Sequence, residues 1–130
     1  MSKLTILCFV VAIGMAETPS SARAEPAGAS YTARQASTGA RDYALSCSRC
    51  HGAQLLGISA PPLTGPRFRN RWPVSTLYRF VSQQMPADRR GSLSPATCSA
   101  IVAFLLRRNG HLAGAVPLTP SRASAIATKL

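Results

Sequence analysis

Apolar residues recur at helical spacing in three parts of the chain, and no segment shows the alternation of apolar and polar residues that is typical of a strand. The first of these parts predicts a helix over residues 38–50, with Thr38 as its N-cap. Gly39, Tyr43 and Cys47 follow one another at intervals of four residues, so they share one face of this helix. A long segment rich in Gly and Pro comes next and predicts an irregular connection.

A second helix is predicted over residues 75–84, with Ser75 as its N-cap. The helix should end near Met85, because Pro86 disfavours helical backbone in the residue that precedes it. Its apolar face is formed by Leu77, Phe80 and Val81.

The third helix is predicted between Ser94 and Gly110 and has clear signals at both of its ends. Ser94 is a good N-cap, Pro95 suits the first helical position, and Gly110 suits the residue beyond the end. The C-terminal tail, residues 115–130, has room for a short helix after Thr119. The chain therefore predicts an all-α domain with long loops. The apolar stripe of the third helix is formed by Cys98, Ile101, Val102 and Leu105, with Phe104 beside them.

The N-terminus has the pattern of an export signal. Lys3 precedes an apolar run of 13 residues, and Ala22-Arg23-Ala24 has the small-x-small form that signal peptidase accepts. Because a membrane span needs about 20 residues, a cleavable signal peptide, residues 1–24, is favoured over an uncleaved anchor. We expect a periplasmic protein without stable membrane insertion, which begins with a flexible leader over residues 25–37.

The chain is strongly basic, with 15 Lys and Arg against four Asp and Glu. Removal of the signal peptide would leave 13 basic and three acidic residues, and a formal charge of +10. Such a protein should associate with acidic partners, at rates that fall as salt is added. Nucleic acid is disfavoured as a partner, because export removes the protein from it and no basic helix or aromatic platform is present.

Two thiols and an imidazole stand together in Cys47-x-x-Cys50-His51. A zinc site would need about four ligands, and no second C-x-x-C or pair of histidines is present. A thioredoxin-like dithiol would need strands around it, and none is predicted. C-x-x-C-H is the attachment signature of one covalent haem c, in which the two cysteines bind the porphyrin and the histidine binds the iron. A buried porphyrin would also enlarge the apolar core of so small a domain.

The second axial ligand of the iron can be argued by elimination. Met85 is the only methionine after the signal peptide, and it lies 34 residues after His51. Its polar surroundings, QQMPAD, argue against the ordinary role of methionine as a core residue. His111 is the other candidate, but it follows Gly110 at a helix end and should be solvated. A thioether opposite histidine favours ferrous iron and raises the reduction potential.

At this point the chain resembles the class I, mitochondrial-type cytochromes c. The resemblance covers residues 38–114 and is carried, in order, by GARDYALSCSRCHG, APPLTG, QQMPADRRGSLSP and AIVAFLLRRNG. Within the class, the chain is most similar to the single-haem cytochromes associated with bacterial quinoprotein dehydrogenases. The resemblance implies the cytochrome c fold, in which the first helix crosses the last and Gly39 permits their close approach.

The resemblance also implies roles for two residues outside the haem motif. The carbonyl of Pro61 would accept a hydrogen bond from the outer N–H of His51, which orients the ring. Trp72 would donate its indole N–H to a haem propionate, unless it is simply a core residue. The family supplies no role for Cys98, which its place on the apolar stripe marks as a buried inert thiol rather than as one half of an intermolecular disulfide.

The function that follows is that of an exported electron carrier and not an enzyme, because two axial ligands leave no open position on the iron. Its partners would be acidic redox proteins, among them a quinoprotein dehydrogenase, met in brief encounters driven by charge. A second hypothesis makes the protein a fixed subunit of a periplasmic dehydrogenase or oxidase complex. A third makes it a haem peroxidase or gas sensor in which Met85 does not bind the iron.

Overall fold

The computed structural model describes residues 30–130, so the predicted signal peptide and the start of the predicted leader lie outside the described part. This part is built from α-helices and two isolated β-bridges, which confirms the predicted all-α fold. None of these helices is long and apolar enough to cross a bilayer. The helices are α1 (Ala33–Ser46), α2 (Ser48–His51), α3 (Pro66–Arg71), α4 (Val74–Gln84), α5 (Pro95–Arg108) and α6 (Pro120–Ala125).

Helix α1 begins five residues before the predicted start, so the prediction that Thr38 caps it is wrong. The N-cap is Thr32, whose side chain accepts a hydrogen bond from the backbone N–H of Gln35 at 3.1 Å. Residues 33–37, which the sequence predicts to be part of the flexible leader, instead form the first turns of the helix. Alanine, arginine and glutamine favour helix here although they show no apolar periodicity, and Ala36 is fully buried.

Helices α1 and α5 cross at a point where no side chain could fit between them. A Cβ atom added to Gly39 would lie 1.8 Å from the carbonyl oxygen of Ala100 and 2.9 Å from the backbone nitrogen of Ile101. Because both neighbours are backbone atoms of a helix, neither could move aside. The crossing therefore depends on glycine at this position.

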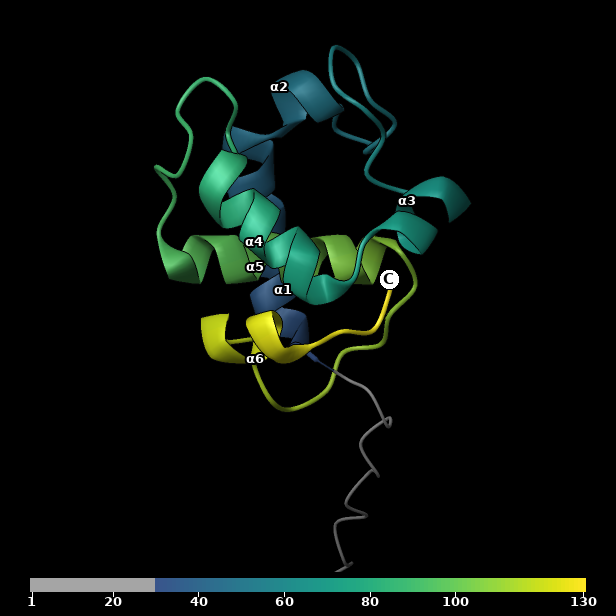
Figure 1. Cartoon of the computed structure of the whole chain (residues 1–130), viewed down its shortest axis with the longest axis vertical. Helices are drawn as coiled ribbons and strands as arrows, with labels where there is room; N and C mark the ends of the chain where they lie inside the picture. Colours follow the sequence, from purple (N-terminus) through teal and green to yellow (C-terminus); the bar gives the residue numbers. More distant parts are fainter. Residues whose placement is uncertain (1–29) are drawn as a thin grey trace, which may run out of the picture.

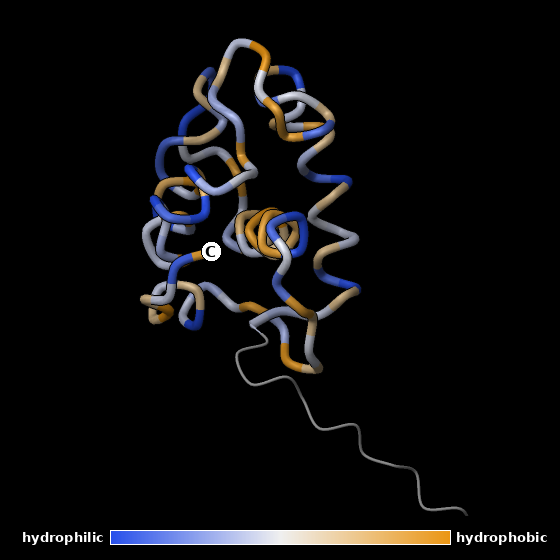
Figure 2. Tube along the Cα trace, turned by 90° about the vertical axis from the view of Figure 1, so that its right-hand side faces the viewer, coloured by the Kyte–Doolittle hydropathy of each residue, from blue (hydrophilic) through white to orange (hydrophobic). Residues whose placement is uncertain are grey.

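Helix α5 runs through the middle of the molecule and supplies much of its core. Its predicted N-cap is confirmed, since the Ser94 hydroxyl accepts the N–H of Thr97 at 3.1 Å. All residues from Cys98 to Leu106 are buried, so the helix is apolar on every side and not along a single stripe. Figure 2 shows it nearly end-on, as a mainly hydrophobic coil surrounded by the other elements. Such a helix is a core helix.

Helix α4 begins at Val74, and the predicted cap by Ser75 is wrong, because Ser75 already lies within the first turn. The N-cap residue is Pro73, which offers no side-chain hydrogen bond. Leu77 and Val81 are buried as predicted, whereas Phe80 is 39% exposed. The helix ends at Gln84, directly before Met85, which has extended backbone as expected of a residue that precedes proline.

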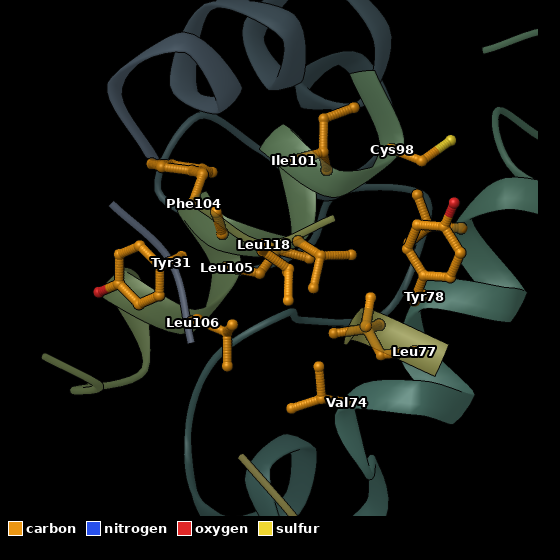
Figure 3. Packing of buried hydrophobic residues seen from close by; sticks show 14 of the residues in the cluster. Tyr31, Val74, Leu77, Tyr78, Cys98, Ile101, Phe104, Leu105, Leu106 and Leu118 are labelled. Carbon is orange, nitrogen blue, oxygen red and sulfur yellow. The ribbon is translucent and has the colours of Figure 1, made fainter. Parts of the chain in front are cut away.

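The C-terminal residues return to the body of the protein. They form α6, which packs against α4 and α5 and lies at the opposite end of the molecule from α2 (Figure 1). Leu118 and Ala123 are fully buried, and Leu118 is among the core side chains drawn in Figure 3. This segment is therefore a part of the folded core.

We predict that Gly39→Ala lowers the free energy of unfolding by about 3 kcal/mol or more, because the added methyl group would overlap the backbone of α5. Denaturant unfolding followed by circular dichroism measures this. The exposed change Ala44→Gly in the same helix should cost only about 1 kcal/mol. A Gly39→Ala variant within about 1 kcal/mol of the parent would contradict the close crossing.

Candidate haem-binding site

The C-x-x-C-H segment forms a single helical turn that follows α1 almost without interruption. The N–H of Cys47 still donates to the carbonyl of Tyr43 at 2.8 Å, as in a continuing helix. The carbonyl of Cys47 then accepts the N–H groups of Cys50 at 3.1 Å and His51 at 2.9 Å. The two thiols and the imidazole are thereby carried on one turn, which is short and fixed to the end of α1.

The imidazole of His51 is held in one orientation by a backbone carbonyl. Its Nδ1 lies 2.8 Å from the carbonyl oxygen of Pro61, the contact that the resemblance implies. Because a carbonyl oxygen can only accept, Nδ1 must carry the proton. The lone pair of Nε2 is therefore free to bind a metal, and the hydrogen bond makes the ring a stronger ligand.

The loop that carries Pro61 is folded tightly around the same turn. The carbonyl of Cys50 accepts the N–H groups of three successive residues, Ile58, Ser59 and Ala60, at 3.0 to 3.1 Å. Gly57 makes this possible, since it has a φ of 83° and a Cβ atom there would lie 2.6 Å from the carbonyl oxygen of Ala60. The position of the Pro61 carbonyl is thus fixed by the cysteine turn itself.

Tyr43 ties the site to the helix crossing through a hydrogen bond that its place on the face of α1 did not reveal. Its hydroxyl donates to the carbonyl of Gly52 at 2.7 Å, directly after His51. Its ring packs against Phe104 of α5, with centroids 5.2 Å apart. The side chain is 2% exposed, and burial raises the pKa of its hydroxyl to about 12, so that it remains a donor.

Cys47 does not have the electrostatics of a redox-active thiol. Burial raises the pKa of Cys47 to about 11, with smaller contributions in the same direction from Cys98, Asp42 and Cys50. A reactive dithiol needs a cysteine whose pKa is lowered. Cys98 is fully buried on α5, and burial raises its pKa too, as expected for an inert thiol and not for an intermolecular disulfide.

The donor set fits covalent haem better than it fits zinc. Between residues 30 and 130, no three His, Cys, Asp or Glu side chains are grouped as a metal site would require. Two thiols and one imidazole with a free Nε2 on a single turn are instead the donors that haem c uses. Cys47 of this turn is half-buried and packs against the hydrophobic core, as do Leu63 and Trp72, and an apolar ring could extend this core.

Met85 and Trp72, the other predicted site residues, lie at the two ends of α4. Met85 is half-buried at the C-cap of the helix. Trp72 lies before its start, with the ring of Phe80 5.2 Å away, that of Phe68 6.5 Å away, and the guanidinium of Arg71 5.6 Å from its centroid. Trp72 therefore has core contacts of its own. Roles of both residues toward haem remain predictions.

His111, the rejected ligand candidate, is half-buried and not solvated as expected. Burial lowers the pKa of its imidazole, which favours the neutral ring. Its backbone carbonyl accepts a hydrogen bond from the Tyr31 hydroxyl, so this part of the chain is fixed beside the start of α1.

A surface ion pair joins the C-x-x-C-H turn to the loop after Met85. Arg49, between the two cysteines, contacts Asp88, three residues after Met85, with an N–O distance of 3.1 Å. These residues could not be paired from the sequence, because 39 positions separate them. The side chains are 83% and 52% exposed, so solvent screens the interaction.

Comparison with known families decides what kind of domain carries this site. Residues 34–105 match the family described as "Cytochrome C oxidase, cbb3-type, subunit III". The match covers more than half of the chain and includes the C-x-x-C-H turn and Met85. The chain belongs to this family. It is a class I c-type cytochrome domain, and the predicted cytochrome c fold is confirmed.

A solved structure resembles this cytochrome over most of its length. It is described as "Crystal Structure of the Sulfane Dehydrogenase SoxCD from Paracoccus pantotrophus", with 28% sequence identity and a TM-score of 0.60. The match covers 78% of this chain and 62% of that chain, so the cytochrome spans less than two thirds of its relative. No curated protein matches significantly. These comparisons give no support to the predicted association with quinoprotein dehydrogenases.

We predict that Asp88→Asn lowers the free energy of unfolding by less than about 1 kcal/mol, because both partners of the Arg49 ion pair are largely exposed. Denaturant unfolding at low and high salt measures this, and the small loss should vanish at high salt. Arg89→Gln, a charge change in the same loop, is the control. A loss above about 2 kcal/mol that persists at high salt would contradict the assignment of a screened pair.

Proposed function

We propose that this cytochrome is an exported, single-haem protein that carries one electron at a time between periplasmic redox partners. The observation that carries the proposal is the orientation of His51. A hydrogen bond from Nδ1 to a backbone carbonyl leaves Nε2 free on the same turn that presents two cysteines. Membership of a c-type cytochrome family supports electron transfer as the activity.

Each residue of the proposed site has one task. Cys47 and Cys50 would hold haem c through thioether bonds, and His51 and Met85 would bind its iron. Haem c supplies one-electron chemistry at its iron when it is bound. The protein fixes the histidine through Pro61, and Trp72 would donate its indole N–H to a propionate.

The charge of the described surface suits a transient carrier. Asp42 and Asp88 are the only acidic residues between positions 30 and 130, against 13 Lys and Arg. Five of the arginines lie on α3 or in the loop after Met85: Arg67, Arg69, Arg71, Arg89 and Arg90. Acidic redox proteins would therefore be attracted over a distance and released quickly, which favours turnover over tight binding.

A second candidate function is that of a fixed subunit in a periplasmic dehydrogenase complex. The solved structure that resembles this chain is a dehydrogenase, which favours this alternative. Purification from the native host at low and at high salt separates the two. A carrier held by charge dissociates from its partner at high salt, whereas a subunit held by an apolar interface remains in the complex.

We predict that the exported protein, matured in a host with haem-attachment machinery, has sharp α and β absorption bands when reduced. When oxidised it should have the weak far-red band of a sulfur-to-iron bond. Met85→Ala should abolish the far-red band and leave the haem attached, because His51 and the cysteines remain. His111→Gln is the matched control, since it removes the other candidate ligand, and it should leave the far-red band unchanged.

Either of two results would contradict this assignment. A far-red band that survives Met85→Ala, or is absent from the parent, would mean that Met85 does not bind the iron. Binding of cyanide or peroxide by the ferric parent at low concentration would then favour the peroxidase or sensor alternative, in which the sixth position is open.

A further inference from the structure

The C-terminal segment, residues 118–130, lies outside the part of the chain that the family match covers. Hydrogen bonds nevertheless join both of its ends to the rest of the domain. At its start, the side-chain amide of Gln35 donates to the carbonyl of Leu118 at 2.7 Å and accepts the N–H of the same residue at 2.8 Å. Leu118 is 1% exposed and lies among the core side chains drawn in Figure 3, so this pair of hydrogen bonds is anchored in the core.

The far end of the segment caps α4. Helix N-termini leave N–H groups without partners in the helix, and a side chain or water usually accepts them. Pro73 cannot do so here. Instead the N–H of Val74 donates to the carbonyl of Thr128 at 3.0 Å, and that of Ser75 donates to the carbonyl of Ile126 at 2.9 Å.

The last residues of the segment also bind the backbone of Trp72 and Pro73, which precede the helix. The N–H of Leu130 donates to the carbonyl of Trp72 at 3.2 Å, and an antiparallel bridge pairs Pro73 with Lys129. The segment therefore fixes Trp72 and the start of α4 together. The far end of α4 leads directly into Met85.

We propose that residues 118–130 form a C-terminal brace that positions α4 and, through it, the Met85 ligand and Trp72. This inference rests on the proposed function, in which Met85 binds the haem iron. A helix of 11 residues is a stiff rod about 16 Å long. A small rotation at its braced N-terminus therefore displaces the sulfur at its other end. Without the brace, Met85 is more easily exchanged for an external ligand.

The test removes residues 126–130 by a stop codon after Ala125 and keeps the rest of the chain. Imidazole is titrated into the ferric holoprotein while loss of the far-red band is followed. The truncation removes the three backbone hydrogen bonds that join residues 126–130 to Trp72, Val74 and Ser75. Three such bonds, at the lower end of their ordinary strength, correspond to about a tenfold change in an equilibrium constant, so imidazole should bind about tenfold more tightly. Lys129→Gln removes the same positive charge but no backbone bond, and should bind imidazole as the parent does.

A purely structural role would give a different pattern. The truncated protein would then unfold at lower denaturant concentration, yet its imidazole affinity in buffer would stay within twofold of the parent. That result would overturn the brace. Gln35→Ala, which removes the clamp on Leu118 and leaves every residue of the segment in place, should give an effect in the same direction as the truncation and smaller.

Hydrogen exchange on the unaltered holoprotein tests the brace even where the truncated chain fails to mature. The amides of Val74 and Ser75 should be protected to a degree similar to that of Leu77, although the first N–H groups of a helix normally exchange fast. Fast exchange at Val74 and Ser75 would overturn the proposal.

The failure of the brace and that of the proposed function are distinguishable. A parent protein without the far-red band refutes Met85 as the ligand, and the brace of that ligand falls with it. A parent that shows the band, together with a truncated chain that binds imidazole no better, refutes the brace alone.

Discussion

The contact between α1 and α5 at Gly39 is the constraint on which the rest of the structure depends. Backbone meets backbone there, because a single methyl group would come within 1.8 Å of the Ala100 carbonyl oxygen. The crossing sets the angle and the distance between the two longest helices. Tyr43, one turn further along α1, then reaches both Phe104 and the carbonyl after the haem motif. The site is thus positioned by a helix that cannot slide.

From this crossing the site is assembled by backbone hydrogen bonds more than by side chains. The cysteine turn continues α1, and the loop after it folds back onto the carbonyl of Cys50. This fold places the Pro61 carbonyl against His51, which sets the protonated nitrogen of the ring. The path of the main chain therefore decides which nitrogen of the imidazole is left to bind a metal. A hydrogen bond from the other nitrogen is the usual way in which a protein orients a ligating histidine.

Local signals in the sequence were enough for the fold class and for the haem motif. Ser94 and Pro95 set the start of α5, and Cys47, Cys50 and His51 are adjacent in sequence and so lie on one turn in the structure. The start of α1 was missed, because residues 33–37 favour helix without an apolar pattern.

Contacts between distant residues that the family resemblance does not imply could not be predicted. Arg49 and Asp88 are two of many exposed charges, and nothing in the sequence pairs them. The bonds from residues 126–130 to the start of α4 join backbone groups, which every residue carries, so they leave no mark on the sequence. For the same reason the C-terminal tail could be assigned a short helix but no place in the core.

The central claim is that Cys47 and Cys50 hold one haem in an exported chain. Intact-mass spectrometry of protein from the periplasm of a maturation-competent host, under denaturing conditions, tests it most directly. The account predicts a chain that begins at Glu25 and carries one haem, with the added mass on the peptide that contains residues 47–51. An unmodified chain, from a host shown to mature a control cytochrome, would contradict the account.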